Sequence, residues 1–539
     1  MIVSTLLFTA LAASGHGSHT APGASEPVPL FDDLGSYHRK ISTKNRTAQK
    51  YFDQGLRLAY GFNHDEAERA FREAARLDPK CAICYWGIAL ILGPNINMPM
   101  DAAKNAQAVE AVSKAKAITR GTGAERALID ALAARYSADA AADRAKLDEA
   151  YASAMKVAHQ RFPKDDDVAT LYAEALMDLR PWRFWSTDGT PAPGTEEIVT
   201  TLELVLKRNP SHPGANHYYI HATEASKNPG RALDSAKRLE TLVPGAGHLV
   251  HMPAHVYMRT GNYAGASEAN ERAAAIDEKY IEKHNVQGVY PVMYYTHNVQ
   301  FLAAAAAMEG RSAVSIGAGR KATDLAAPLV KEMPMAEFVV PFAMYALLRF
   351  EKWDDVLALP KPDPGMPTTV ALWHYGRGVA FASKKMLEQA DSEKAAFELA
   401  ATLVPADAMM NLNLSKDLLA VAAASLDARL REAKGASGAI DSWTSAVKAE
   451  DMLAYDEPPA WFYPVRESLG GAYLRAGQAA QAERVFREDL ERNPENGRSL
   501  FGLAEALKAQ KKDVEAKEIT ARYKKAWAKA DVTPTIAGL

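Results

Sequence analysis

Six histidines and one glutamate near the middle of this chain have types and spacings that suit a metal site. They are His217, His221 and Glu224 in NHYYIHATEAS, His248, His251 and His255 in GHLVHMPAHVYMR, and His297 in YYTHNVQF. Side chains three or four positions apart lie on one face of a helix, so two imidazoles at that spacing can converge on one ion. Neutral imidazole binds Zn, Cu, Ni and Fe, and added carboxylates favour Zn, Fe or a two-metal centre over Cu(I). The pattern predicts a site for Zn, Fe or Cu and leaves the identity of the metal open.

The elements that position these histidines follow from a repeat that is clearest near the two ends of the chain. Small, apolar and proline residues recur at fixed places in AQKYFDQGLRLAYGFNHDEAERAFREAARLDPK and in YPVRESLGGAYLRAGQAAQAERVFREDLERNPEN. Counted from Ala48, these residues are Gly55 at 8, Ala67 at 20, Phe71 at 24, Ala74 at 27 and Pro79 at 32; the second segment repeats the pattern with Leu469, Gly470, Tyr473, Ala482, Phe486 and Pro494. Small residues let two helices approach closely, and the proline ends the second helix.

These are the signature positions of the tetratricopeptide repeat, which has a period of 34 residues. The chain therefore resembles the tetratricopeptide repeat (TPR) family, and as a whole it is similar to exported bacterial TPR proteins of undefined activity. The resemblance implies an all-α fold, a tetratricopeptide-type α-solenoid in which helix-turn-helix repeats form a right-handed superhelix.

The histidines fall into register with this repeat. His217 and His251 are 34 residues apart, and so are His221 and His255. Counting from Pro213 and from Gly247 puts His217 and His251 at position 5, His221 and His255 at 9, His248 at 2 and Glu224 at 12. The family resemblance implies that these positions line the concave groove where ligands bind.

Two further carboxylates fall on groove positions one repeat earlier. Counting from Asp166 in DDVATLYAEALMDLR puts Glu174 at 9 and Asp178 at 13. We expect Glu174, Asp178 or Glu224 to act as a metal ligand or as the general base of a metal-dependent enzyme.

Two other interpretations of the histidines stay open beside the metal site. One is a metal-free TPR scaffold whose groove binds a small molecule, a peptide or a protein partner, and the other is a stack of structural histidines copied by repeat duplication. The sequence contains no HEXXH, G-x-S-x-G, Walker or Rossmann signature, so enzyme activity remains undecided.

Composition narrows the class of partner. The 539 residues are 48% hydrophobic and 24% charged, and the formal net charge is -3. Without a basic excess or a Lys/Arg run interleaved with aromatic residues, the chain lacks the charge pattern of a nucleic-acid binder. No apolar run beyond the first residues approaches the roughly 18 to 20 residues that cross a bilayer.

The first fifteen residues, MIVSTLLFTALAASG, pair an apolar run with small residues and resemble a signal peptide, which predicts a periplasmic or secreted protein. We divide the chain into a signal peptide at 1–15, an extension at 16–44, a solenoid with the histidine-rich groove at 45–310, irregular helical repeats at 311–450 and C-terminal TPR repeats at 451–539.

Four other segments invite a structural interpretation. Cys81 and Cys84 in CAIC fit a local disulfide or two buried thiols equally well. LGPNIN is expected to be a rigid loop at the edge of the groove, and the Pro- and Trp-rich segment 181–197 is long enough to cover the groove as a lid. DEPPAWFYPVRESLG, from Asp456, is interpreted as a packing corner.

Overall fold

The computed structural model describes residues 28–139 and 141–539. The predicted signal peptide at 1–15 and residues 16–27 of the predicted extension lie outside this part of the chain. Among the described residues there are twenty-five α-helices and a single pair of two-residue strands, β1 (Met409–Met410) and β2 (Asn413–Leu414). The fold is all-α, as the sequence predicts.

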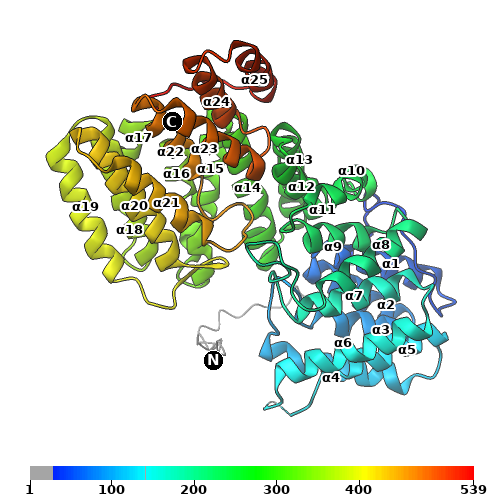
Figure 1. Cartoon of the computed structure of the whole chain (residues 1–539). Helices are drawn as coiled ribbons and strands as arrows, with labels where there is room; N and C mark the ends of the chain where they lie inside the picture. The colour runs from blue at the N-terminus through cyan, green and yellow to red at the C-terminus, as the bar shows by residue number, and fades with distance from the viewer. Residues whose placement is uncertain (1–27, 140) are drawn as a thin grey trace.

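Consecutive helices pack against each other in pairs, and the pairs stack into a tetratricopeptide-type α-solenoid (Figure 1). The first half comprises α1 (Arg46–Tyr60) with α2 (His64–Leu77), α3 (Ala82–Ile91) with α4 (Asn105–Ala117), α5 (Gly123–Ala133) with α6 (Arg144–Arg161), α7 (Asp166–Asp178) with α8 (Thr195–Arg208), α9 (Pro213–Thr223) with α10 (Leu233–Leu242), and α11 (Gly247–His251) and α12 (Pro253–Thr260) with α13 (Tyr263–His284).

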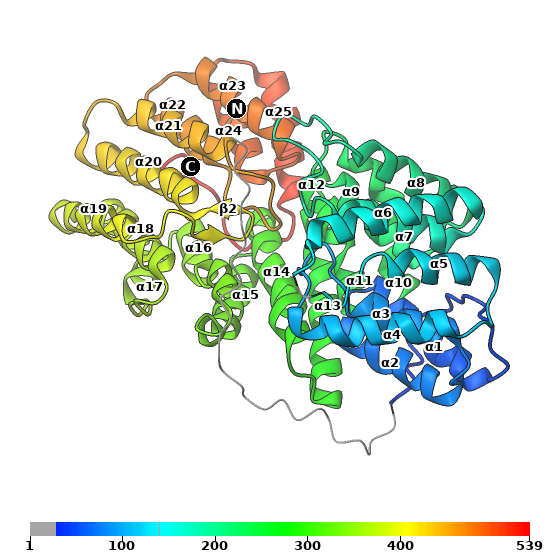
Figure 2. The ribbon, with the colours of Figure 1, turned by 90° about the horizontal axis from the view of Figure 1, so that it is seen from below.

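The second half continues with the same pairing from α14 onward. It comprises α14 (Thr296–Glu309) with α15 (Ser312–Ala326), α16 (Phe342–Arg349) with α17 (Trp353–Ala358), α18 (Pro367–Ser383) with α19 (Leu387–Thr402), α20 (Ser415–Lys434) with α21 (Ala439–Asp451), α22 (Val465–Arg475) with α23 (Ala479–Arg492), and α24 (Gly497–Ala509) with α25 (Asp513–Ala526). Figure 2 shows the two halves side by side, with α14 between them.

The repeat signature acts through direct helix contact at both ends of the chain. A Cβ at Gly55 would lie 2.7 Å from the Phe71 ring, and a Cβ at Gly470 would lie 2.5 Å from the Phe486 ring. Both phenylalanines are fully buried. Because a Cβ would collide with the phenylalanine ring, only glycine lets the paired helices pack this closely. The predicted repeat register is therefore confirmed at Gly55 and Gly470.

The helices that carry the histidines begin where the sequence predicts. α9 begins at Pro213, whose missing N–H costs nothing at the first helical position, and the His212 ring caps it by accepting a hydrogen bond from the Ala215 N–H. α11 begins at Gly247. It is separated from α12 at Met252, because Pro253 has no N–H to continue the helical hydrogen bonds. A short π-helix, η3 (Tyr290–Tyr295), leads into α14 and so brings His297 beside these helices.

The described part of the N-terminal extension has no helix before α1 and lies across the first repeats. Arg39 pairs with Asp165 and Asp167 at the start of α7, and the Tyr37 hydroxyl donates to Asp167. These half-buried and buried charges pair across more than a hundred residues of sequence, and the Arg39 N–H also donates to Asp53 of α1, so the extension contacts both α1 and α7.

The hydrophobic core runs along the inside of the solenoid. One cluster of buried side chains extends from Leu34 to Ala305 and a second from Ala274 to Val485, so the two overlap where the halves meet. Cys81 and Cys84 form a disulfide at the start of α3, which decides between the two alternatives left by the sequence. No helix among residues 28–139 and 141–539 is long and apolar enough to cross a membrane.

Candidate metal centre

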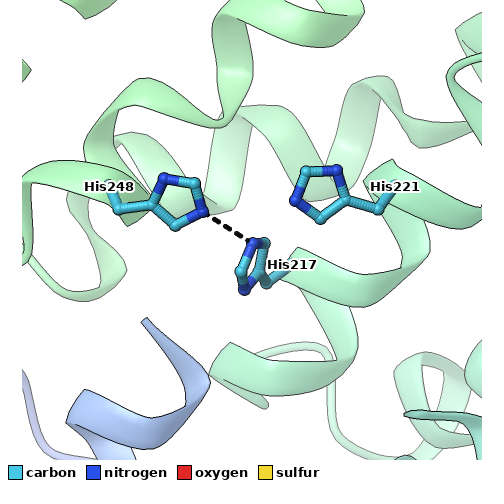
Figure 3. A group of neighbouring side chains, drawn as sticks. All are labelled: His217, His221 and His248. Carbon is cyan, nitrogen blue, oxygen red and sulfur yellow. Dashed lines mark hydrogen bonds between the residues drawn. The ribbon is translucent and has the colours of Figure 1, made fainter. Parts of the chain in front are cut away.

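The structure brings all six predicted histidine ligands together from α9, α11, α12 and α14. They form two groups of three: a first group of His217, His221 and His248, and a second group of His251, His255 and His297. Figure 3 shows the rings of the first group turned toward a common centre. Five of the six are at most 3% exposed, and His297 is half-buried. The histidine side chains are therefore largely buried, whereas the sequence pattern suggested side chains along an open groove.

The two groups have closely matching dimensions. In the first group, the His217 ring centroid lies 4.8 Å from that of His221 and 4.9 Å from that of His248. In the second, the His251 centroid lies 4.7 Å from that of His255 and 4.8 Å from that of His297. Within each group, the ligand nitrogens lie within 4.8 Å of one another.

Hydrogen bonds at the backs of two rings fix which nitrogen faces the centre. The Nδ1 of His217 lies 2.6 Å from the Tyr60 carbonyl oxygen, and the Nδ1 of His251 lies 2.6 Å from the Asn270 side-chain oxygen. The Asn270 amide nitrogen donates to the Ala266 carbonyl, which leaves its oxygen facing the ring. Because both partners only accept, each Nδ1 carries the proton and each Nε2 presents its lone pair to the centre.

Glu224 fixes the ring orientation of one histidine in each group by binding its Nδ1. One carboxylate oxygen lies 2.8 Å from Nδ1 of His221, and the other accepts a hydrogen bond from Nδ1 of His255. The Nε2 of His221 is buried without a hydrogen-bond partner, and the Nε2 of His255 lies 2.7 Å from the Nε2 of His251. Carboxylates in this position orient metal-bound histidines in many metalloproteins.

The electrostatics keep most of these imidazoles neutral. Burial lowers the pKa of His217, His248 and His251 well below the usual histidine value, and it lowers the pKa of His297 to about 3. Neutral imidazole is the form that binds metal.

Glu224 is the one group of the cluster that holds a negative charge against burial. Burial would raise its pKa, but the adjacent His255 and His221 lower it to about 2. Burial opposes charge on His255 as well, yet the Glu224 carboxylate raises the pKa of that imidazole.

The histidines adjoin a cavity of about 2270 Å³. Four of them line it, His221 and His248 from the first group and His255 and His297 from the second, while His217 and His251 lie behind. Both groups therefore have two cavity-facing rings and one ring further back.

Segments far apart in the sequence line this cavity. From the predicted lid, Trp182 and Trp185 line it, and the Trp182 ring packs edge-on against His221 at 4.9 Å. From the LGPNIN loop, Asn97 lines the cavity and donates to the Tyr294 hydroxyl over 3.2 Å. LGPNIN thus lies at the edge of the site, as the sequence predicts, and segment 181–197 contributes to the wall, while its role as a lid stays a prediction.

The other two predicted carboxylates are held apart from the histidines. Glu174 and Asp178 form a buried pair on α7, and Asp178 makes a salt bridge with the fully buried Arg135. Asp178 lines the cavity and Glu174 does not. Of the described residues, the groups of three that could share an ion include Glu224 but neither member of this pair. The buried Arg135 accounts for the difference, because it draws the Asp178 carboxylate toward itself.

Sequence reasoning missed two residues that reach the cluster from the second half of the solenoid. The single proton of the Tyr455 hydroxyl is shared between Glu224, 3.3 Å away, and Glu457. Tyr455 and Glu457 both line the cavity. Burial raises the pKa of Glu457 to about 8. The segment from Asp456 is therefore part of the site wall as well as a packing corner, and no local pattern marks a contact between residues 231 positions apart.

Comparisons with known proteins add little to this geometry. No family model matches the chain, and no curated protein matches it. Among solved structures, a human IFIT1 dimer with m7Gppp-AAAA is 13% identical over 90% of each chain with a TM-score of 0.31. Yeast Tom70 is 12% identical over 88% of this chain and 93% of its own, with a TM-score of 0.30. Scores this low carry no argument about what the present cavity binds.

Proposed function

We propose that this protein binds transition-metal ions through its histidine cluster and presents them to a ligand in the adjoining cavity. The observation that carries the proposal is the inward direction of the Nε2 atoms. With Nδ1 bonded outward in His217 and His251, each of these rings presents the Nε2 lone pair to the centre, which is the form of imidazole that binds a metal ion.

The outer partners support a metal site over a stack of structural histidines. Structural histidines satisfy both ring nitrogens within the protein, but here the Nε2 of His221 and the Nδ1 of His248 are buried without partners. The Nε2 atoms of His217 and His248 lie 3.1 Å apart, close to the separation of two nitrogens bound to one tetrahedral ion at the usual Zn–N distance of about 2.0 to 2.1 Å.

The cavity supports access of a further ligand. A structural metal has all its positions filled by protein, whereas a site that acts on a substrate leaves a position for water or substrate. Four of the six histidines line a large cavity with Trp182 and Tyr455 on its walls. We therefore propose that each metal ion keeps one position open to a small organic molecule held in this cavity.

We also propose that the protein works outside the cytoplasm, in the periplasm or as a secreted protein. The Cys81–Cys84 disulfide supports this, because structural disulfides persist in oxidising compartments.

The test is elemental analysis of protein purified without a polyhistidine tag and reconstituted with Zn, Cu or Fe. We expect at least one tightly bound ion per chain, and a lower metal content with retained helical circular dichroism in His251→Gln/His255→Gln, which removes two ligands of the second group. His374→Gln is the matched control, because His374 pairs with Glu393 in the second half and contacts none of the six histidines. Reconstituted protein without stoichiometric metal would refute the proposal.

A further inference from the structure

We infer that the cluster is a dinuclear centre, in which two copper ions occupy two equivalent sites of three imidazoles each. The inference rests on the proposed metal binding and specifies the number of ions, their ligands and the kind of molecule that joins them.

The equivalence of the two sites follows from the repeat itself. In each group, two histidines come from positions 5 and 9 of one repeat: His217 and His221 from α9, and His251 and His255 from the α11–α12 helix. The third comes from the next stretch of helix along the solenoid, His248 in α11 for the first group and His297 in α14 for the second. The step that relates one repeat to the next therefore carries one three-imidazole site onto the other.

The two sites are adjacent and share no ligand. The His221 and His255 ring centroids are 5.3 Å apart, and those of His248 and His251 are 5.7 Å apart, so rings of different groups are nearly as close as rings of the same group. Two three-coordinate ions this near each other have the arrangement of a two-metal site, in which the ions are about 3.5 to 4 Å apart.

The ligand set of each site consists of nitrogen atoms. Glu224 is the carboxylate that groups with these histidines among the described residues, and its two oxygens engage Nδ1 of His221 and Nδ1 of His255, on the side away from the inward-facing Nε2 atoms. Each ion then has a nitrogen-only set, which suits copper as well as zinc and lacks the oxygen ligands that Mg, Ca and Mn prefer.

The charge of the buried ions favours copper. Six neutral imidazoles and one carboxylate offset little of the charge of two divalent ions in a buried site, whereas two Cu(I) ions leave much less uncompensated charge. When both ions are Cu(II), a small bridging anion must supply the missing negative charge.

Both proposed ions would be reached from the same cavity. His221 and His248 of the first group and His255 and His297 of the second face the cavity, and the position-5 histidines of both groups lie behind them. A small anion such as hydroxide or azide that enters from the cavity can therefore contact both ions at once.

The experiment combines copper stoichiometry with electron paramagnetic resonance (EPR) of full-length protein. We expect two copper ions per chain. Once both ions are Cu(II) and azide is added, we expect an EPR signal far below two spins, because a bridging anion couples the two unpaired electrons. A full two-spin signal under these conditions would contradict the bridged arrangement.

Matched double variants then separate the two sites. His217→Gln/His248→Gln and His251→Gln/His297→Gln should each retain one copper ion with a full one-spin signal that azide does not quench. Glutamine is close to histidine in size and keeps an amide for the outer hydrogen bonds, and circular dichroism checks the fold. His374→Gln should behave as the unsubstituted protein.

The failure outcomes are distinct. One copper per chain in the unsubstituted protein, or loss of all copper from either double variant, overturns the dinuclear centre while metal binding stands. No bound metal of any kind in the unsubstituted protein overturns the proposed function as well.

Discussion

His217 and His251 occupy the same place in consecutive repeats, and each turns Nδ1 toward an acceptor behind its helix, 2.6 Å away in both cases. The acceptor is a backbone carbonyl for the first and the Asn270 amide oxygen for the second. The repeat thus reproduces the direction of the imidazole while the supporting group differs. A direction preserved with different partners indicates that the inward-facing Nε2 is the feature that both sites share.

Replacing Glu224 with glutamine should weaken metal binding without removing a proposed ligand. The amide offers one acceptor oxygen where the carboxylate offers two, so His221 and His255 cannot both keep their outer hydrogen bonds. Loss of such an outer partner typically lowers metal affinity about 10- to 100-fold. Competition with a chelator of known affinity measures the change, and Glu393→Gln, which removes the partner of His374, should leave affinity unaltered. Equal affinities for the two variants would contradict this role of Glu224.

Gly247→Ala should destabilise the protein through the helix that carries His248 and His251. A Cβ at this position would lie 1.9 Å from the Asp277 carboxylate, so α11 or α13 must shift. Such overpacking costs about 1 to 3 kcal/mol, which thermal or urea unfolding resolves. Gly317→Ala in α15 is the control, since nothing lies within 4 Å of its added Cβ. An alanine there should stabilise the helix by about 0.5 to 1 kcal/mol. Unchanged stability of Gly247→Ala would show that α11 can move away from Asp277 without loss of stability.

The buried Asp277 should make stability fall as pH rises toward neutrality. Burial raises its pKa to about 7 from the usual value of about 3.8 for an exposed aspartate, while Tyr290 and Asn298 donate hydrogen bonds to it. Between these two pH values the folded state holds a proton that the unfolded chain has released, so the free energy of unfolding decreases with increasing pH. The full effect is on the order of 4 kcal/mol.

Asp277→Asn isolates this contribution from that of the other acidic residues. The variant cannot lose a proton at this position, so its stability relative to the unsubstituted protein should improve from pH 5 to pH 8. Urea unfolding at several pH values measures the difference, and a difference that is constant across this range would refute the assignment.

Trp182→Ala should speed removal of metal by an external chelator. The indole packs edge-on against His221 and lines the cavity, so its loss opens a route to the first group of histidines. We expect a severalfold faster rate of metal loss, measured by stopped-flow absorption with excess EDTA. Trp373→Ala on α18 removes an indole that is absent from the cavity lining and should leave the rate unaltered. Equal rates for both variants would show that segment 181–197 does not limit access.

Much of the fold was predictable because the repeat signature is local. Gly55 and Gly470 need only their own helix pair to explain them, and Pro213 and Gly247 mark helix starts by backbone chemistry alone. The placement of His217, His221, His251 and His255 on one face of two consecutive repeats follows from the same 34-residue period, whereas His297 reaches them through the π-helix η3, which the period does not predict.

The supporting groups of the site depended on tertiary structure. Tyr455 approaches Glu224 from 231 residues away, and Arg135 pairs with Asp178 from a different helix pair. Contacts between distant repeats depend on the curvature of the whole superhelix, which small packing differences at every interface set together. The sequence by itself determined which helices carry the imidazoles. The tertiary structure decided that these imidazoles are buried, that Nε2 atoms face one another, and that Glu224 binds Nδ1 of His221 and His255. Burial and ring direction could not be predicted because they are properties of the assembled solenoid.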